Sequence, residues 1–267
     1  MSVATSGHER IAAAFASHGK HAALMPYLMG GYPDLDASAA AGEAAADAGA
    51  DLIELGIPFS DPLADGPVIH AAAVEALKAG TTPHGVLRVC ERLAERVPVV
   101  LMVYANVVLQ AGGTAEAFAR RAAAAGASGL IVPDLPHDEA EGARAACDAE
   151  GIALVPLVAP TTPPERLERI GADARGFVYA VSVLGTTGER DQAPPGLEPM
   201  VERIRAATEV PVAVGFGIST NEQAAAVGEF ADGVIVGSRL VRAAGEGGPE
   251  AVGEVVGELS RALRDRW

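Results

Sequence analysis

The chain has 267 residues and a formal net charge of −15 at pH 7, and this acidic balance argues against nucleic acid as a partner. It has no uncharged apolar segment of the length that a membrane span needs, and the N-terminal stretch with Glu9 and Arg10 does not resemble a signal peptide. We therefore expect a cytoplasmic protein. The cysteines, Cys90 and Cys147, lie in predicted helices and are interpreted as small apolar residues rather than a disulfide or redox site.

Short apolar runs alternate with Ala-rich segments of helical period along the chain. The runs are typical of strands buried on both faces; they cover 22–30, 51–58, 97–104, 128–134, 152–160, 176–182, 211–217 and 233–238. Helices are predicted at 36–49, 67–96 with a break near Thr81–Pro83, 114–126, 137–150, 163–171, 195–208, 219–228 and 249–266. Their predicted N-terminal caps include Asp36, Thr114 and Ser219.

This alternation predicts an α/β fold, a (β/α)8 TIM barrel that occupies residues 1–267 as a single domain. Residues 7–19 suit an additional N-terminal helix that closes the bottom of the barrel. A doubly wound open sheet is the alternative, because periodicity alone does not prove that a sheet closes. The turn-rich stretch 184–196 is predicted to be a lid or a surface insertion after the sixth strand.

A carboxylate interrupts the apolar run of the second predicted strand, "DLIELGIP" (51–58). Side chains of a strand alternate between its faces, so Ile53, Leu55 and Ile57 are predicted to face the helices and Glu54 to face the barrel interior. Burial there would raise the pKa of Glu54, which suits a general acid or a proton shuttle near neutral pH. The alternative is a structural glutamate paired with a distant arginine or tyrosine.

Other candidate site features follow the ends of predicted strands. Asp65, after the second strand, is either a turn or cap residue or a second carboxylate facing the same cavity, while Asp61 is a weaker candidate for chemistry. The glycine-rich segments "GFGIST" (215–220) and "GSRL" (237–240) expose backbone N–H groups where barrels usually bind phosphate, and "GTTG" (185–188) is a third candidate contributor.

Two catalytic mechanisms are disfavoured by the residues that are missing from strand ends. A Schiff-base aldolase needs a lysine at a strand end, whereas Lys20 precedes the first predicted strand and Lys78 lies on a predicted helix. The histidines show no metal-ligand spacing, so no metal site is expected. Acid–base chemistry by carboxylates on a phosphorylated substrate therefore remains as the prediction.

The stretch "LIELGIPFSDPLADGPVI" is similar to the signature of the tryptophan synthase α subunit family. The resemblance covers residues 10–245 and continues, in the family's order, in "MPYLMGGYPD", "LMVYAN", "VPDLP", "GFVYAVS", "TTG", "GFGIS" and "GVIVGS". It implies a lyase that cleaves indole-3-glycerol phosphate to indole and glyceraldehyde 3-phosphate by a retro-aldol reaction, without a cofactor of its own.

The resemblance also implies the roles of individual residues. Glu54 would protonate the indole C3 and help to deprotonate the glyceryl hydroxyl, Asp65 would hold the indole N–H, and Tyr179 would lie near Glu54. The residues implied to line the indole pocket are Tyr27, Met102, Leu157 and Phe216. Those implied to bind the phosphate or to close over it are Thr187, Gly188, Gly217, Gly237 and Ser238.

Members of the family bind a β subunit that carries pyridoxal phosphate, and they pass indole to it within an α2β2 heterotetramer. The residues that match the partner-contacting surface are Pro58, Asp61, Pro62, Asp134 and Pro136. Their presence favours the partnered enzyme over a stand-alone indole-3-glycerol-phosphate lyase. Another phosphosugar barrel enzyme and a non-catalytic regulatory subunit are further alternatives; retention of both carboxylates and the phosphate loops argues against the latter.

Four positions depart from the family pattern: His70, Val183, Thr186 and Arg239. His70 stands where glutamine is usual. Arg239 follows Gly237 and Ser238, where a small residue is frequent, and it is expected either to strengthen phosphate binding or to face solvent. None of the four matches a residue with an implied catalytic role, so they leave the predicted reaction unchanged.

Overall fold

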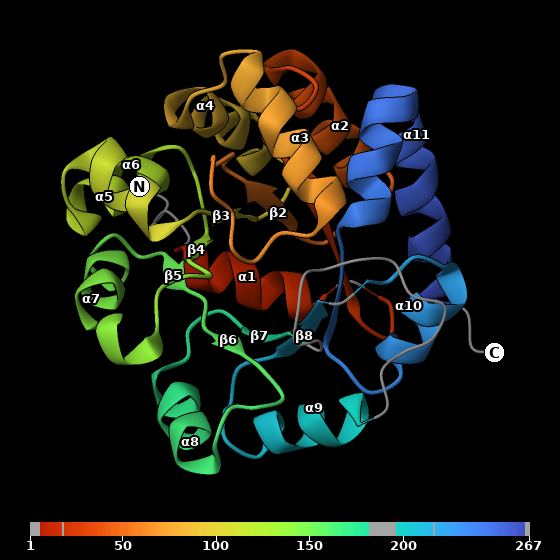
Figure 1. Ribbon diagram of the computed structural model, residues 1–267. Helices are drawn as coiled ribbons and strands as arrows, with labels where there is room; N and C mark the ends of the chain where they lie inside the picture. Colours follow the sequence, from red (N-terminus) through yellow and green to blue (C-terminus); the bar gives the residue numbers. More distant parts are fainter. Residues whose placement is uncertain (1–5, 18, 182–195, 216, 265–267) are drawn as a thin grey trace, which may run out of the picture.

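The structure is a computed structural model that describes residues 6–17, 19–181, 196–215 and 217–264. Within these ranges, nine parallel strands form one sheet inside a ring of helices (Figure 1). The strands are β1 (Ala23–Met29), β2 (Ile53–Gly56), β3 (Val99–Met102), β4 (Gly129–Ile131), β5 (Ala153–Leu154), β6 (Leu157–Val158), β7 (Val178–Val181), β8 (Val212–Gly215) and β9 (Gly233–Val236).

The strand order is β5-β4-β3-β2-β1-β9-β8-β7-β6. The strands β5 and β6, which are neighbours in the chain, therefore lie at opposite ends of the sheet. Between them, the Val155 N–H donates to the Leu130 carbonyl of β4, and the Pro156 carbonyl accepts from the Tyr179 N–H of β7, both at 2.9 Å. One continuous segment therefore joins the two ends, and the sheet closes as the TIM barrel that the sequence predicts. The predicted fifth strand, 152–160, is split into β5 and β6 because Pro156 has no N–H to offer a ladder.

The helices surround the barrel, and the break predicted near Thr81–Pro83 separates α3 from α4. Their bounds are α1 (Gly7–Ala16), α2 (Leu35–Asp47), α3 (Pro67–Lys78), α4 (Pro83–Ala94), α5 (Ala105–Gly112), α6 (Ala115–Ala124), α7 (Glu141–Ala149), α8 (Pro164–Asp173), α9 (Leu197–Arg205), α10 (Asn221–Gly228) and α11 (Ser238–Ala262), with a short 3₁₀ helix, η1 (His137–Glu139). None of the helices in the described ranges has the length and apolar character that crossing a membrane would require.

Two helical segments were not predicted from the sequence. They are α5 and the part of α11 before Gly248, where the backbone leaves the helical region (φ 65°, ψ −155°). Glycine tolerates this positive φ, and Pro249 then starts the second part of α11, in agreement with the helix predicted at 249–266. The first part of α11 was missed because its start is a glycine without a side-chain cap.

The predicted caps are correct at one of three positions. Thr114 caps α6, but the cap of α2 is Asp34 rather than Asp36, and the cap of α10 is Thr220 rather than Ser219. Asp34 and Thr220 have the extended backbone that an N-cap needs, so the helices begin two residues and one residue away from the predicted positions.

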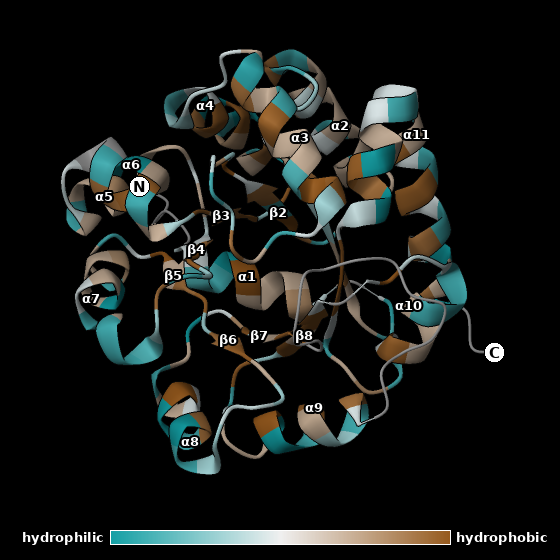
Figure 2. Ribbon diagram, in the orientation of Figure 1, coloured by the Kyte–Doolittle hydropathy of each residue, from teal (hydrophilic) through white to brown (hydrophobic). Residues whose placement is uncertain are grey.

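The apolar core has two main layers, one inside the barrel and one between strands and helices. In Figure 2 the strands are coloured mainly as hydrophobic, whereas the surrounding helices carry both hydrophobic and hydrophilic residues. Leu52 belongs to the inner layer, whereas Ile53, Leu55 and Ile57 belong to the outer layer, as the alternation along this strand predicts. Helix α1 lies across the middle of the ring in Figure 1 and inserts Ile11 into the inner layer. The N-terminal end of the barrel is thereby closed, as predicted.

Candidate active site

Glu54 lies in the middle of β2, beside Tyr27 of β1 and Val100 of β3. Its side chain is buried, with 1% of the residue exposed, and neither carboxyl oxygen has a hydrogen-bond partner among the described residues. Burial, with a smaller contribution from the charge of Asp65, raises the pKa of Glu54 to about 8. The carboxyl group is therefore mainly protonated at neutral pH and has a proton to donate.

Asp65 lies in the loop between β2 and α3, and its side chain is hydrogen-bonded rather than capping a helix. The N-cap of α3 is Gly66, while the Tyr104 hydroxyl donates to Asp65 Oδ1 at 3.1 Å. Burial raises the pKa of Asp65, whereas the bond from Tyr104 and the proximity of His70 lower it. Of the two readings that the sequence leaves open for Asp65, the structure favours a second carboxylate near Glu54.

Tyr27 and Tyr179 flank Glu54, and each fits because the neighbouring strand has a glycine beside its ring. A Cβ atom added to Gly56 would overlap the Tyr27 hydroxyl, and one added to Gly215 would overlap the Tyr179 hydroxyl. Burial, together with the nearby carboxylates, raises the pKa of both tyrosines well above its usual range. Both hydroxyls therefore keep their protons and can donate hydrogen bonds in the cavity.

A cavity at the C-terminal ends of the strands collects these groups. Every predicted catalytic or substrate-binding residue that the structure describes lines it: Tyr27, Glu54, Asp65, Met102, Leu157, Tyr179, Gly217, Gly237 and Ser238. Some predicted positions lie outside the described residues: the site residues Thr187, Gly188 and Phe216, and the residues Val183 and Thr186 that depart from the family pattern. The arrangement combines a protonated carboxyl group with a second carboxylate and an apolar wall, which suits acid–base chemistry on an aromatic substrate.

Several lining residues were not predicted from the sequence, notably Ala64, Ile69, Pro133, Val181 and Ile235. They are apolar and carry no chemical signature of their own. The signal that could have identified Val181 and Ile235 is their place near the C-terminal ends of strands, where barrel sites form. Tyr104 was also given no role, although it is the last residue of the third predicted strand and lies two residues after the end of β3.

The two loops predicted to bind an anion differ in the structure. At the start of α10, Thr220 and Gln223 form a capping box that satisfies the backbone there. At the start of α11, Gly237 provides no side-chain cap, and Ser238 is 7% exposed. The first turn of α11 is therefore the better candidate for an anion site, because it has no side-chain cap and its residues Gly237 and Ser238 line the cavity.

Arg239 lies in that turn but does not line the cavity. Its guanidinium donates to Asn221 Oδ1 at 2.9 Å and to Glu258 Oε2 at 2.7 Å. The predicted phosphate contact of Arg239 stays a prediction, and 20% of its side chain is exposed to solvent. The side chain ties the first turn of α10 to the second part of α11.

The residues predicted to contact a partner lie on the loops that follow β2 and β4, at the C-terminal face of the barrel, and their environments differ. Pro58 is buried, whereas Asp61, Asp134 and Pro136 are exposed and Pro62 is half-buried. Asp134 also has an internal role, because its Oδ1 accepts from the Ala105 N–H at 2.8 Å at the start of α5. Two apolar side chains near this face are exposed without having been predicted, Leu63 at 82% and Leu109 at 54%.

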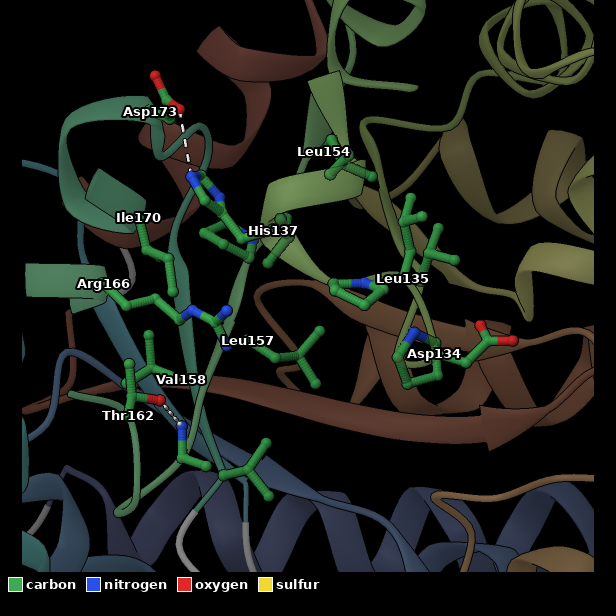
Figure 3. A pocket seen from close by; sticks show the side chains of 18 of the residues that line it. Asp134, Leu135, His137, Leu154, Leu157, Val158, Thr162, Arg166, Ile170 and Asp173 are labelled. Atoms are coloured by element: carbon green, nitrogen blue, oxygen red, sulfur yellow. Dashed lines mark hydrogen bonds and ion pairs between the residues drawn. The ribbon is translucent and has the colours of Figure 1, made fainter. Parts of the chain in front are cut away.

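A larger hollow of about 510 Å³ adjoins the cavity and shares Ala64, Pro133, Leu157 and Val181 with it. Figure 3 shows His137 turned toward Asp173, with Nε2 3.4 Å from Oδ2, and Arg166 along the same wall. Arg144 also pairs with Asp173, at 3.2 Å, and Arg166 pairs with Asp138 at 2.6 Å. Because these charges are paired with one another, the smaller cavity with its unpaired Glu54 is the site suited to chemistry.

Comparison with known proteins agrees with this geometry. The family model for the tryptophan synthase alpha chain matches residues 14–261. The alpha chain of Gloeobacter violaceus is 48% identical over 260 residues, covering 96% of this chain and 92% of the relative. The alpha chain of Synechococcus sp. (strain CC9902) is 52% identical over 223 residues, 82% of each chain.

Solved structures are also similar over nearly the whole chain. A structure of Mycobacterium tuberculosis tryptophan synthase has a TM-score of 0.89 at 43% identity and covers 96% of this chain and 99% of that one. The alpha chain of Legionella pneumophila has a TM-score of 0.86 at 34% identity, covering 97% and 98%. This chain therefore belongs to the tryptophan synthase alpha chain family and is a lyase of the alpha reaction.

Proposed function

We propose that this chain cleaves indole-3-glycerol phosphate to indole and glyceraldehyde 3-phosphate, with Glu54 as the proton shuttle and Asp65 as the group that holds the indole nitrogen. The observation that carries these roles is the buried, unpartnered Glu54 at the wall of a cavity that Asp65 also lines. A buried carboxyl group without a protein partner is costly unless a ligand supplies the missing interactions.

The pKa of about 8 lets Glu54 start as a neutral acid at pH 7. It donates its proton to the indole C3, and the positive charge that develops on the ring nitrogen is stabilised by the Asp65 carboxylate. The resulting Glu54 carboxylate then takes the proton of the hydroxyl on the carbon attached to C3. The carbon–carbon bond breaks, its electrons restore the indole ring, and the former hydroxyl carbon becomes the aldehyde.

The remaining residues bind the two ends of the substrate. The indole packs against Tyr27, Met102 and Leu157, and Tyr179 lies beside Glu54. Phe216, which the structure does not describe, would also line the indole pocket. The phosphate binds at the first turn of α11, on Gly237 and Ser238, with Gly217 nearby; Thr187 and Gly188 would close over it. The uncapped start of α11 supports this placement.

The family works with a β subunit, and we infer that this chain does so in a cytoplasmic α2β2 heterotetramer. Pyridoxal phosphate would then belong to the β subunit, and the chain itself, a single barrel, would need no cofactor. The exposed Asp61, Leu63 and Asp134, on the loops that follow β2 and β4, support a partner-binding face. A stand-alone lyase is the less favoured alternative.

Indole release from indole-3-glycerol phosphate tests the proposal. The purified chain is assayed alone and with a tryptophan synthase β subunit, and we expect slow release alone and faster release with the partner. No release in either condition would refute the reaction. Equal rates in both would instead favour the stand-alone lyase.

A further inference from the structure

We infer that Tyr104 is a positioning residue that holds Asp65 in its reactive orientation; this inference rests on the function proposed above. Tyr104 directly precedes α5, and only 3% of the residue is exposed. Its hydroxyl donates to Asp65 Oδ1 at 3.1 Å and accepts from the Ala64 N–H, also at 3.1 Å. A single hydroxyl thus holds both the side chain of Asp65 and the backbone next to it.

The direction of these two hydrogen bonds follows from the groups involved. The Ala64 amide can only donate, so the hydroxyl oxygen accepts there and its single proton is directed to the carboxylate. That bond occupies Oδ1 and leaves Oδ2 of Asp65 as the oxygen that accepts the indole N–H. Burial and the nearby Asp65 raise the pKa of Tyr104, so the hydroxyl keeps the proton that it donates.

The ring of Tyr104 is held by a separate contact, which makes the hydroxyl a distinct functional element. Phe59 stacks on it, with the ring centroids 5.1 Å apart and the planes inclined by 28°. The next residue, Ala105, donates its N–H to Asp134. Segments 59–65, 104–105 and 134 therefore meet at Tyr104, which links Asp65 to the face where the partner is proposed to bind.

Tyr104→Phe separates positioning from packing, because it keeps the ring and the Phe59 stack and removes only the hydroxyl. We expect kcat for indole release to fall by about tenfold to a hundredfold, as expected for losing a hydrogen bond to a charged group. The value of KM should change less, because the Asp65 contact strengthens when the ring nitrogen becomes positive. Tyr32→Phe is the matched control, since Tyr32 lies outside the cavity lining, and it should keep the wild-type rate.

A double-variant cycle tests whether Tyr104 acts through Asp65. Adding Tyr104→Phe to Asp65→Ala should change kcat by less than about twofold, because the group that Tyr104 positions is already gone. A merely structural role would lower the rate equally in both backgrounds and would overturn the inference, as would a wild-type kcat in Tyr104→Phe. A wild-type chain that releases no indole would refute the proposed function, and this role with it.

Discussion

Asp51 and Glu54 lie on the same short stretch of chain, yet the barrel treats their carboxylates in opposite ways. Asp51, just before β2, has its Oδ2 2.8 Å from Lys20 Nζ and accepts from the Leu24 N–H at 2.7 Å. Glu54, inside β2, has no hydrogen-bond partner among the described residues. Near the N-terminal end of the strands the protein itself supplies the partners of a carboxylate; further along β2 it supplies none that the described residues show, and the proposed function assigns that role to the substrate.

One barrel thus holds two carboxyl groups in different ways. The largely buried Asp51 has its oxygens occupied by a lysine and a backbone amide. A buried carboxyl group without such partners keeps its proton and is available to give it away. Burying a carboxyl group without partners lowers the stability of the folded chain, so it is expected mainly at functional sites.

The largest expected effect comes from replacing Glu54. Glu54→Gln keeps the size of the side chain but cannot transfer a proton, so indole release should fall by about a thousandfold, within the usual range for a general acid–base group. The measurement is the steady-state rate, with circular dichroism to verify the fold. Glu75→Gln, which changes an exposed glutamate on α3, is the control, and a Glu54→Gln rate near that of this control would remove the assigned role.

The matching test at the other carboxylate concerns stability instead of rate. Lys20→Met leaves Asp51, whose side chain is only 11% exposed, without its cation, so urea unfolding should show a loss on the order of 3 kcal/mol. The kcat of the folded variant should stay close to wild type, because neither residue lines the cavity. Lys78→Met, at an exposed lysine of α3, should change stability little. A Lys20→Met chain as stable as wild type would mean that the pair contributes nothing.

A third test reveals the stability cost of Glu54. Its pKa rises from 4.5 in the unfolded chain to about 8 in the folded one, so between these values the native state binds a proton that the unfolded state does not. Stability is therefore complete at low pH and falls by about 1.4 kcal/mol per unit as pH rises through this window.

Glu54→Gln removes that dependence. Between pH 5 and pH 8, the free energy of unfolding of the wild type should fall by on the order of 3 kcal/mol more than that of Glu54→Gln. The change with pH is taken within each protein, so the cost of burying the glutamine amide cancels. Urea titrations at the two pH values measure the change. Parallel pH dependences for the two proteins would contradict the raised pKa.

The smallest expected effect is in the pH dependence of the rate. Because the active form of Glu54 is protonated and its pKa is about 8, kcat/KM should be about twofold lower at pH 8 than at pH 7. The free enzyme's profile, measured at low substrate concentration, reports this group. A flat profile up to pH 9 would exclude a protonated Glu54 as the starting acid.

Much of the fold and site follows from local patterns. The alternation in 51–58 predicted that Glu54 faces inward and Leu55 outward, because the side-chain period of a strand is two wherever it lies. Turn-rich strand ends likewise predicted where Gly217 and Gly237 would line the cavity. The helix starts were less certain, since Asp34 and Asp36 are both chemically suitable caps.

Other features depend on contacts between distant segments, which no local pattern encodes. Three such features are found only in the folded chain. They are the closure of the barrel through Val155 and Pro156, the pairing of Arg239 with Glu258, and the hydrogen bond from Tyr104 to Asp65. Residue type and strand period are local properties, so the sequence alone indicates which polar side chains face the barrel interior and follow the strand ends. Burial and hydrogen bonding are set by neighbours far away in the chain, so the folded barrel is needed to tell that Asp51 has partners and that Glu54 has none among the described residues.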